Sequence, residues 1–425
     1  MDIRVKISEG CDNQCRRPQG SASPAPIFPT SGTVGGVKAL EFSRNEGRYA
    51  AAAISSRLRP GSGASAGPLQ LVERDPFDLP GDGWHRVTTL LSGICGSDLA
   101  TVEGRSPRYF EPWVSFPFVP GHEVVGRIED GSRVVIEPVL GHHARGFEPP
   151  FDGAAPGDGN DYRHLVSGDL EPGIQTGYCA STGGGWSTEF VAHSSQLHPV
   201  PEKLSDEAAV MIEPTAVGVH GALRAGINDG DTVAIIGAGT MGLTTLAAVR
   251  HFANPGTVIV GAKYPEQKDL ARELGADLVV APGELQRAVR RATGSFVVGD
   301  DLSGGADVII DAVGSAATIE LAIGSTRPRG RVVMVGMPGK VSLQLTALWH
   351  RETELIGAYT YGTERLGDGT TPRTFDLATD LVAEAKLERL VTDVFPLDKY
   401  EEALEQAAMA GPRGSVKVCF DLRDL

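Results

Sequence analysis

The sequence has no apolar run long enough to cross a membrane. A spanning helix needs about 20 mostly apolar residues, and polar or charged residues interrupt every long stretch of the 425-residue chain sooner than that. The first residues also lack the apolar core of a secretory signal. We therefore expect neither a membrane partner nor export from the cell.

Positive charge and cysteine are both scarce. The chain has 39 Lys and Arg against 54 Asp and Glu, a net charge of −15, which argues against a nucleic-acid partner because phosphate binding needs basic patches. Its cysteines are scattered and odd in number, so we expect no disulfide framework and a cytoplasmic location. They are Cys11, Cys15, Cys95, Cys179 and Cys419.

The chain is long and apolar enough for more than one core. With 41% hydrophobic and 22% charged residues over 425 positions, two or more domains are expected. Residues 1–36 are rich in Ser, Pro and Gly, which predicts a disordered tail. Short alternating runs between Gly and Pro turns, such as Val37–Phe42 and Arg133–Ile136, predict an irregular β domain over residues 37–204.

From residue 205 onward the pattern is α/β. Apolar strands alternate with helical segments over residues 205–360, which predicts a doubly wound parallel sheet. A C-terminal segment, residues 361–425, has two predicted helices and ends in a predicted strand, Ser415–Phe420. The strands expected in the parallel sheet are Thr232–Ile236, Thr257–Val260, Leu278–Val280, Val308–Ile310 and Arg331–Val335.

A glycine-rich turn follows the first of these strands. In Gly237-Ala238-Gly239-Thr240-Met241-Gly242 the first glycine permits the tight turn, the second lets the backbone approach a pyrophosphate, and the third lets the helix pack on the strand. Because the turn leads from a strand into a helix, it predicts dinucleotide binding at the helix N-terminus. The alternative is a tight turn without a ligand.

The end of the next strand bears on which nicotinamide is bound. NAD enzymes usually place an acid there to hold the ribose 2′-hydroxyl. This chain has Gly261-Ala262-Lys263-Tyr264, with a cation for a 2′-phosphate and a ring to lie against the adenine. We therefore expect NADP, with NAD as the alternative if Lys263 is only a surface lysine.

Two motifs of the first domain carry zinc-binding residue types. Gly93–Asp98 contains Cys95, and Pro120–Glu123 contains His122 and Glu123. Thiolate, imidazole and carboxylate are the ligands that Zn²⁺ prefers, and a catalytic zinc uses three of them with one position open. Either motif alone could be a buried cysteine or a turn, but together they predict a catalytic zinc site.

With these motifs the chain resembles the zinc-type medium-chain alcohol dehydrogenases, in the branch of sorbitol and threonine dehydrogenases. The resemblance covers roughly residues 37–425. It implies a GroES-like catalytic domain, a Rossmann nucleotide-binding domain and a C-terminal segment that returns to the catalytic domain. The matching stretches are Gly93–Leu99, Gly121–Gly126, Glu213–Pro214 with His220, Gly237–Gly242, Gly305–Gly314 and Gly330–Gly336.

The resemblance also implies residue roles. Cys95 and His122 would bind zinc, and either Glu123 or Glu213 would supply the third bond. Ser97 would pass the alcohol proton outward, and Asp98 would accept the second ring N–H of His122. In the matching stretches of the nucleotide domain, Val313, Val335 and Gly336 would contact the cofactor together with the glycine turn.

Three departures from the family pattern matter. Ala100 stands where many relatives have a histidine at the outer end of the proton path. No cysteine lies between residues 96 and 178, where many relatives hold a second zinc, so we expect one zinc per chain. Relatives commonly begin at a strand that matches Val37–Leu40, which suggests that residues 1–36 do not belong to the native protein. A genuine flexible tail is the alternative.

The sequence thus predicts a zinc-dependent dehydrogenase that transfers a hydride between an alcohol or polyol and NADP, or reduces the carbonyl in reverse. Its partners would be the small-molecule substrate and further copies of itself, as a homodimer or homotetramer. Two alternatives remain: a zinc-free quinone or enoyl reductase on the same scaffold, and a non-catalytic NADP-binding protein.

Overall fold

A computed structural model describes residues 36–106 and 112–425, and Gly36–Leu425 forms one compact unit. The tail predicted for residues 1–36, with Cys11 and Cys15, falls outside the described residues except for Gly36. In the described part of the chain, no helix is long and apolar enough to cross a membrane.

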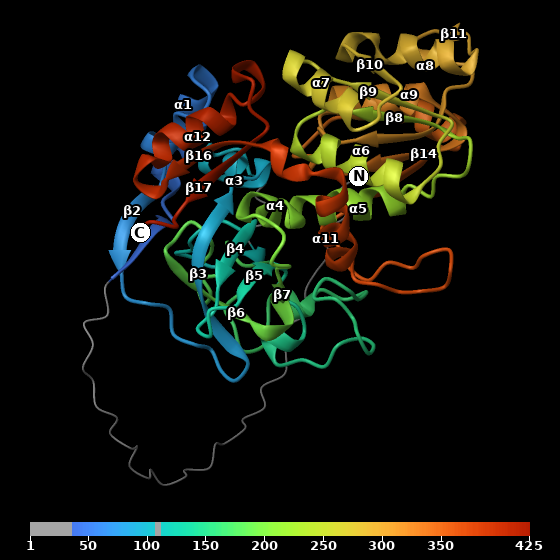
Figure 1. The fold of residues 1–425 in the computed structure, drawn as a ribbon. Helices are drawn as coiled ribbons and strands as arrows, with labels where there is room; N and C mark the ends of the chain where they lie inside the picture. The colour runs from blue at the N-terminus through green and yellow to red at the C-terminus, as the bar shows by residue number, and fades with distance from the viewer. Residues whose placement is uncertain (1–35, 107–111) are drawn as a thin grey trace, which may run out of the picture. The chain divides into compact units, whose positions relative to one another are not determined.

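The first region comprises the described residues up to 204 together with the C-terminal strands β16 and β17. It is built on a largely antiparallel sheet with the strand order β16-β17-β3-β4-β5-β7, in which β6 also pairs with β3 (Figure 1). A separate antiparallel pair of strands, β1 with β2, precedes it. The strands are β1 Val37–Phe42, β2 Leu69–Arg74, β3 Trp84–Gly93, β4 Val124–Arg127, β5 Arg133–Ile136, β6 Glu189–His193, β7 Leu197–Pro199, β16 Val391–Pro396 and β17 Lys417–Asp421.

Helices also lie within the region predicted as an irregular β domain. Helix α1 (Glu46–Leu58) and the short α2 (Gly63–Ala66) connect β1 to β2. The Asn45 side chain caps α1 by accepting a hydrogen bond from the Arg48 N–H, and an alanine run follows, so helix propensity and capping agree. Alternation and turn residues alone do not predict this helix, whereas its cap and its alanine run do.

The nucleotide-binding sheet has six parallel strands in the order β10-β9-β8-β13-β14-β15, which is the order typical of dinucleotide-binding folds. All five predicted strands are present. Their bounds are β8 Thr232–Ile236, β9 Thr257–Gly261, β10 Leu278–Val280, β13 Ala306–Asp311, β14 Thr326–Met334 and β15 Glu354–Gly357; a small hairpin, β11 Val297–Val298 with β12 Asp301–Leu302, lies outside the sheet.

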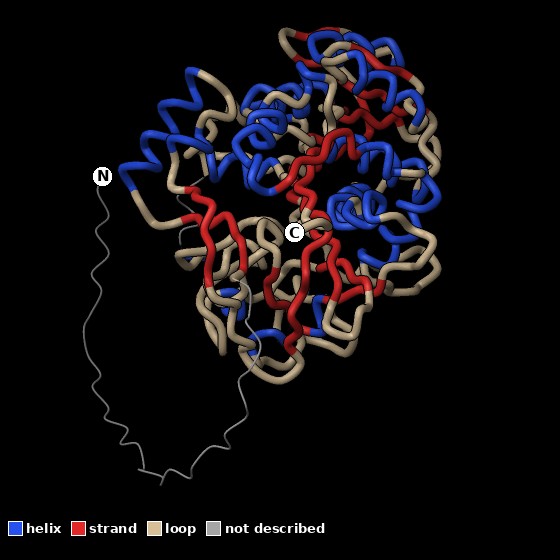
Figure 2. The backbone as a smooth tube through the Cα atoms, turned by 60° about the vertical axis from the view of Figure 1, so that its left-hand side comes forward, coloured by secondary structure: helices blue, strands red, loops and turns tan. Residues whose placement is uncertain are grey.

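Helices cover both faces of this sheet (Figures 1 and 2). Val233 and Ile235 of β8 belong to a core with α5 (Ile212–Arg224) and α6 (Thr240–Phe252), whereas Ala234 and Ile236 belong to a second core with α8 and α9. A strand buried on both faces reads as a continuous apolar run, as β8 does. The other helices are α3 Gly96–Val102, α4 Asp206–Val210, α7 Pro265–Glu273, α8 Leu285–Thr293, α9 Ala316–Ser325, α10 Thr346–His350, α11 Thr374–Ala385 and α12 Tyr400–Ala408.

The last strand joins the sheet of the first region. Strand β17 pairs antiparallel with β3, with Cys419 opposite Gly93 and Phe420 opposite Ser92. Because β3 leads directly into the Cys95 motif, the pairing brings the C-terminal strand beside the predicted zinc ligands. The Ile94 N–H donates to the carbonyl of Val418 at 2.9 Å, which continues the contact beyond the strand.

Candidate active site

Cys95 stands at the N-terminus of α3, at the end of β3. Its thiol is free and partly exposed. The backbone N–H of Cys95 donates to Oδ2 of Asp98 at 3.0 Å, so the first turn of α3 fixes the carboxylate relative to the cysteine. Asp98 is buried, which keeps this arrangement away from solvent.

His122 lies against Asp98 and Cys95. Its ring is buried, and Nδ1 is 3.3 Å from Oδ1 of Asp98. This distance is within the range of an ion pair, but the angles do not form a hydrogen bond. Nδ1 of His122 therefore has no hydrogen-bond partner in the described part of the chain. Burial lowers the pKa of His122, but the Asp98 carboxylate and then the Cys95 sulfur more than offset this, so the pKa lies well above its ordinary value.

Glu123, beside His122, is paired with a residue that the sequence analysis did not single out. Nζ of Lys417 lies 2.7 Å from Oε1 and 2.5 Å from Oε2 of Glu123, and both side chains are buried. Burial lowers the pKa of Lys417, but the Glu123 carboxylate raises it above its usual range. The available signal was a lysine within the otherwise apolar run Val416–Phe420.

Glu213 stands at the start of α5 and is buried. The Tyr361 hydroxyl, also missed by the sequence analysis, donates to its Oε1 at 3.1 Å. The pKa of Glu213 is raised to about 7, mainly by burial. Nearby His122 lowers this pKa and Glu123 raises it, and Lys417 and the Tyr361 hydrogen bond also lower it. The charges of His122, Glu123 and Lys417 therefore all act on the Glu213 carboxyl.

These side chains fit a zinc ion in kind. Cys95 supplies a thiol, His122 an imidazole and Glu213 a carboxylate with one oxygen not engaged by Tyr361, which is a donor set typical of catalytic zinc. Both oxygens of Glu123 are engaged by Lys417. Within residues 36–106 and 112–425, no three His, Cys, Asp or Glu side chains are grouped closely enough to hold a metal.

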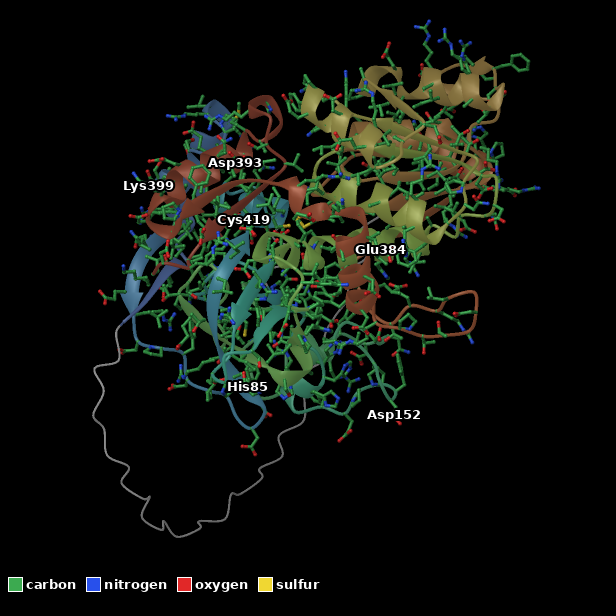
Figure 3. All side chains as sticks on the ribbon, viewed as in Figure 1. His85, Asp152, Glu384, Asp393, Lys399 and Cys419 are labelled. Atoms are coloured by element: carbon green, nitrogen blue, oxygen red, sulfur yellow. The ribbon has the colours of Figure 1, made fainter. Side chains whose placement is uncertain are left out.

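Cys419 lies on β17, where Figure 3 labels it, and faces the same buried region. Burial raises the pKa of its thiol to about 12, and the positive charge of Lys417 lowers it less. Because zinc binds thiolate rather than thiol, a thiol whose pKa is raised in this way is a poor zinc donor.

Around Ser97 and Ala100 the structure adds a tyrosine. The Tyr178 hydroxyl is 3.4 Å from Oγ1 of Thr101 and donates to Oδ1 of Asp98 at 3.5 Å. Burial raises the pKa of Tyr178, so it is a neutral hydroxyl. Tyr178 therefore places a hydroxyl beside Asp98 and Thr101 of α3, whereas Ala100 of the same helix has no polar side-chain group.

The cysteine-free stretch contains a pair of stacked histidines. The rings of His142 and His164 lie 3.9 Å apart at 22°, and His164 is buried. The pKa of His164 is lowered to about 4, mainly by burial, and the neighbouring His142 contributes in the same direction. Parallel rings do not direct two nitrogens at one point, so the stack is a packing arrangement rather than a chelate.

The glycine turn has the shape expected for dinucleotide binding. Gly237 adopts φ +95°, which favours glycine, and a side chain at Gly242 would collide with the Gly237 carbonyl. A side-chain carbon at Gly239 would meet no atom of the described residues within 4 Å. The approach to the N-terminus of α6, which begins with Thr240 and Met241, is therefore open at Gly239.

At the end of β9, Gly261 and Ala262 are buried and Lys263 is exposed. The Lys263 ammonium lies 5.3 Å from the centre of the Tyr264 ring. The Tyr264 ring packs against Gly411, whose hydrogen leaves room for it. The lysine is thus free to meet a phosphate, whereas the tyrosine already has a protein partner.

The remaining predicted cofactor residues lie at the ends of the neighbouring strands. Asp311, the last residue of β13, accepts hydrogen bonds at Oδ1 from the N–H groups of Val313 and Gly314, at 2.9 and 3.2 Å. Its carbonyl accepts from Val335 and Gly336, both at 2.9 Å. Val313 lies next to Gly237, at the point where the strand order reverses and such sheets bind their ligands.

Comparison with known families accounts for most of both regions. Residues 81–202 match the alcohol dehydrogenase GroES-like domain, and residues 240–383 match the zinc-binding dehydrogenase family. Together the two matches cover more than half of the chain.

Individual relatives agree with these matches. The chain is 27% identical to L-idonate 5-dehydrogenase of Vitis vinifera over 83% of its own length and 93% of the relative's. It is 29% identical to human sorbitol dehydrogenase over 80% and 90%. The fold is that of the crystal structure of 2R,3R-butanediol dehydrogenase from Bacillus subtilis, with a TM-score of 0.66, 22% identity, and coverage of 91% of this chain and 99% of that one.

The predicted family and fold class are thereby confirmed. The glycine turn, the zinc-type donor residues and the two matched domains occur in one chain. The chain belongs to the zinc-type medium-chain alcohol dehydrogenases, in the sorbitol dehydrogenase-like branch, and is an oxidoreductase acting on CH–OH groups.

Proposed function

We propose that the protein is a zinc- and NADP-dependent polyol dehydrogenase. One observation carries the proposal: the dinucleotide turn and the zinc motif both contact the same two consecutive residues, Val416 and Lys417. Oγ1 of Thr240, at the start of α6, donates to the carbonyl of Val416 at 3.2 Å, and the next residue, Lys417, binds Glu123. A cofactor on the turn and a substrate beside His122 would thus face one another.

In this proposal Cys95, His122 and Glu213 would hold the zinc. When bound, the metal would act as a Lewis acid that favours ionisation of the substrate hydroxyl or polarises a carbonyl. Asp98 orients His122 through its second ring nitrogen, and Lys417 neutralises Glu123 beside the site. Ser97 would accept the substrate proton, with Tyr178 next to it as a neutral hydroxyl.

A second set of residues, in the nucleotide-binding region, would orient the cofactor for hydride transfer. The N-terminus of α6 would bind the pyrophosphate, and Val313, Val335 and Gly336 would line the nicotinamide side. Holding the nicotinamide and the substrate carbon in one orientation converts a bimolecular step into an intramolecular one. Protein burial of Asp98, His122 and Glu123 keeps the reacting region poor in water.

The substrate class follows from the relatives. Two similar proteins are named L-idonate 5-dehydrogenase and sorbitol dehydrogenase, after polyhydroxylated compounds. We therefore propose a polyol or hydroxy acid rather than a simple alcohol. NADP is proposed over NAD because Lys263 is exposed at the end of β9 and no carboxylate stands there.

The proposal also includes a reducing compartment and a homodimer or homotetramer. The cysteines of the described residues, Cys95, Cys179 and Cys419, are free thiols, as a reducing cytoplasm would maintain. Strand β15 is an outer strand of the six-stranded sheet, and a sheet edge offers unpaired backbone groups to a second copy.

The test is metal analysis combined with turnover. Purified protein should hold one zinc per chain, oxidise polyols with NADP faster than with NAD, and lose activity on treatment with a chelator, with recovery on zinc addition. A protein that reduces quinones or enoyl compounds and is insensitive to chelation would instead be a zinc-free reductase. NADP binding without turnover of any alcohol or carbonyl would indicate a non-catalytic protein.

A further inference from the structure

A cavity of about 230 Å³ lies against the segment that follows β5. The described residues that line it come from three places: the stretch between residues 142 and 156, Ser195 in the turn after β6, and Arg373 directly before α11. None of these lining residues belongs to the zinc motifs or to the glycine turn. One water needs only about 10–15 Å³ of such space, so the cavity has room for a larger molecule.

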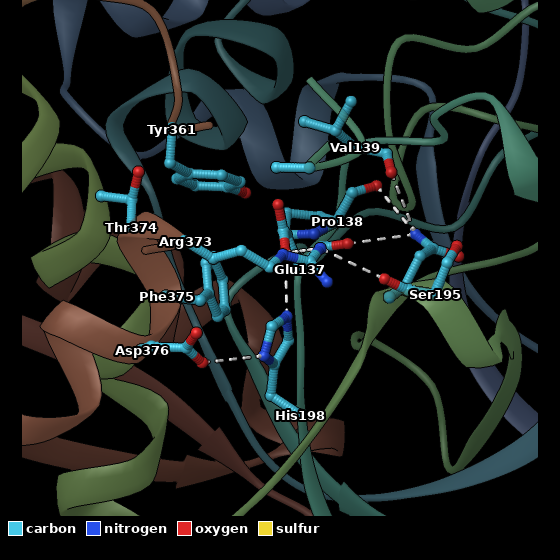
Figure 4. Close-up of polar contacts among 12 residues, drawn as sticks. Glu137, Pro138, Val139, Ser195, His198, Tyr361, Arg373, Thr374, Phe375 and Asp376 are labelled. Carbon is cyan, nitrogen blue, oxygen red and sulfur yellow. Dashed lines mark hydrogen bonds and ion pairs between the residues drawn. The ribbon is translucent and has the colours of Figure 1, made fainter. Parts of the chain in front are cut away.

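Arg373 supplies the cavity with a cation. Its Nη2 binds Oε2 of Glu137 and donates to the carbonyl of Ser195 at 3.3 Å (Figure 4). Its Nε is buried and has no hydrogen-bond partner among the described residues. A buried N–H of a charged group is costly to leave unpaired, so an acceptor is expected to meet it. Because Arg373 lines the cavity, the cavity is the place for that acceptor.

The neighbours of Arg373 hold its guanidinium in place. Glu137 is buried, and its Oε2 lies 2.8 Å from Nε2 of His198 as well as against Arg373. The His198 ring is itself stacked on Phe375, with the ring centres 4.8 Å apart. The arginine is therefore fixed before a ligand arrives, which reduces the ordering that binding would require.

Two histidines add hydrogen-bond donors to the same cavity, His142 and His143. Stacking on His164 at 3.9 Å fixes the His142 ring. Burial, and then His143, lower the pKa of His142, although Asp158 opposes them, so the ring is neutral at pH 7 and offers one N–H. In a chain with a net charge of −15, the described lining of this cavity contains no carboxylate. The groups that face the cavity therefore favour an anion.

The remaining lining, apart from Ser195, is apolar. A fully hydrated anion such as phosphate would make no use of this surface. A carboxylate on a short hydrocarbon chain would cover it and still place its oxygens at a guanidinium. These residues are Pro149, Gly153, Ala154, Ala155 and Pro156.

We propose that this cavity binds a small aliphatic carboxylate, whose oxygens meet Nε of Arg373 and the rings of His142 and His143. The hydrocarbon chain would lie against the prolines and alanines. The proposal needs neither the zinc nor the nicotinamide, so it can fail or stand independently of the proposed function.

The test is isothermal titration calorimetry of the full-length protein with butyrate. Arg373→Lys keeps a positive charge for Glu137 but has no Nε–H, and loss of one hydrogen bond to a charged group typically weakens binding about 10- to 100-fold. We expect that loss for Arg373→Lys. The matched control is Arg163→Lys, the same change at an exposed arginine that is paired with Asp161 and does not line the cavity. It should bind butyrate as the wild type does.

Two further measurements keep the test decisive if Arg373→Lys folds poorly. Butyramide has the shape of butyrate without its charge, and the wild type should bind it about 10-fold or more weakly than butyrate. Ala154→Leu adds bulk to the lining without changing a charge. It should weaken butyrate binding while thermal unfolding stays close to that of the wild type.

Several results would overturn the proposal. A wild-type protein that does not bind butyrate, or that binds butyramide equally well, would show that the cavity does not select a carboxylate. Unchanged affinity in both Arg373→Lys and Ala154→Leu would place the bound butyrate elsewhere on the protein. Tighter binding of inorganic phosphate than of butyrate would mean that the apolar lining contributes nothing to recognition.

Discussion

Lys417 and Glu123 form a buried ion pair between the last strand and the zinc motif. The ammonium lies 2.7 and 2.5 Å from the two carboxylate oxygens, and the side chains are 3% and 1% exposed. The residues are 294 positions apart in the sequence. The pair therefore depends on the return of β17 to β3, and it neutralises a carboxylate that would otherwise lie uncompensated beside His122.

Removing the lysine should destabilise the protein strongly. Lys417→Met leaves the Glu123 charge buried without a partner, which typically costs about 3–5 kcal/mol. Urea unfolding measures the loss. The double variant Lys417→Met/Glu123→Gln should recover much of it, and Lys399→Met, which breaks an exposed pair with Glu402, should stay within about 0.5 kcal/mol of the wild type. Equal losses for Lys417→Met and Lys399→Met would contradict the prediction.

Glu213, rather than Glu123, is expected to be the third zinc ligand. Glu213→Gln should lower zinc affinity by more than the roughly 10- to 100-fold that loss of an outer partner costs. Glu123→Gln should keep its zinc and lose mainly stability, because Lys417 then lacks its counter-charge. Zinc content after dialysis against a graded chelator separates the two. The reverse order would assign the bond to Glu123.

Gly239→Ala should weaken cofactor binding without affecting the fold. The added methyl meets no atom of the described residues, but it occupies the approach to the α6 N-terminus. We expect about a 10-fold or greater rise in the dissociation constant for NADPH, followed by fluorescence titration, with unchanged thermal unfolding. Gly283→Ala adds a methyl in similarly open space elsewhere and should change neither. Normal NADPH affinity in Gly239→Ala would exclude a pyrophosphate at this turn.

Lys263→Ala should shift the cofactor preference toward NAD. One charge-assisted contact to a phosphate is worth roughly 1.5–3 kcal/mol, or about 10- to 100-fold in affinity. Steady-state kinetics should show a rise in KM for NADP with little change for NAD. Lys203→Ala, at an exposed position before α4, is the control. If both cofactors are affected equally, Lys263 does not read the 2′-phosphate.

His164 should make the protein less stable in acid. Burial lowers its folded-state pKa to about 4, against 6.5 for a free histidine, with His142 and Arg145 acting in the same direction and Asp161 opposing. As pH falls below 6.5 the unfolded chain takes up the proton first, so stability present above 6.5 is lost progressively down to about 4.

A variant without this imidazole should lose the effect. At about 1.4 kcal/mol for each pKa unit, the contribution is at most ~3.5 kcal/mol. His164→Gln should give a flatter dependence of Tm on pH between 6.5 and 4 than the wild type. His85→Gln, at a more exposed histidine, should keep the wild-type slope. Parallel curves for His164→Gln and the wild type would show that His164 is not the group responsible.

The sequence predicted the nucleotide-binding sheet well because its signals are local. Strands such as Thr232–Ile236 and Leu278–Val280 are continuous apolar runs bounded by turns, and their bounds coincide with the structure. The glycine turn needs only adjacent residues to specify its shape. The cap and the alanines of helix α1 are equally local signals, but alternation alone does not predict that helix.

The sequence by itself determined the family, the enzyme class and the residue types of the candidate site. Only the tertiary structure decided how those residues are partnered. Lys417 with Glu123 and Tyr361 with Glu213 join positions 294 and 148 residues apart, and no local pattern encodes such contacts. They form because β17 returns to β3 and the segment after β15 reaches α5, and burial then requires every charge and carboxylate brought together there to find a partner.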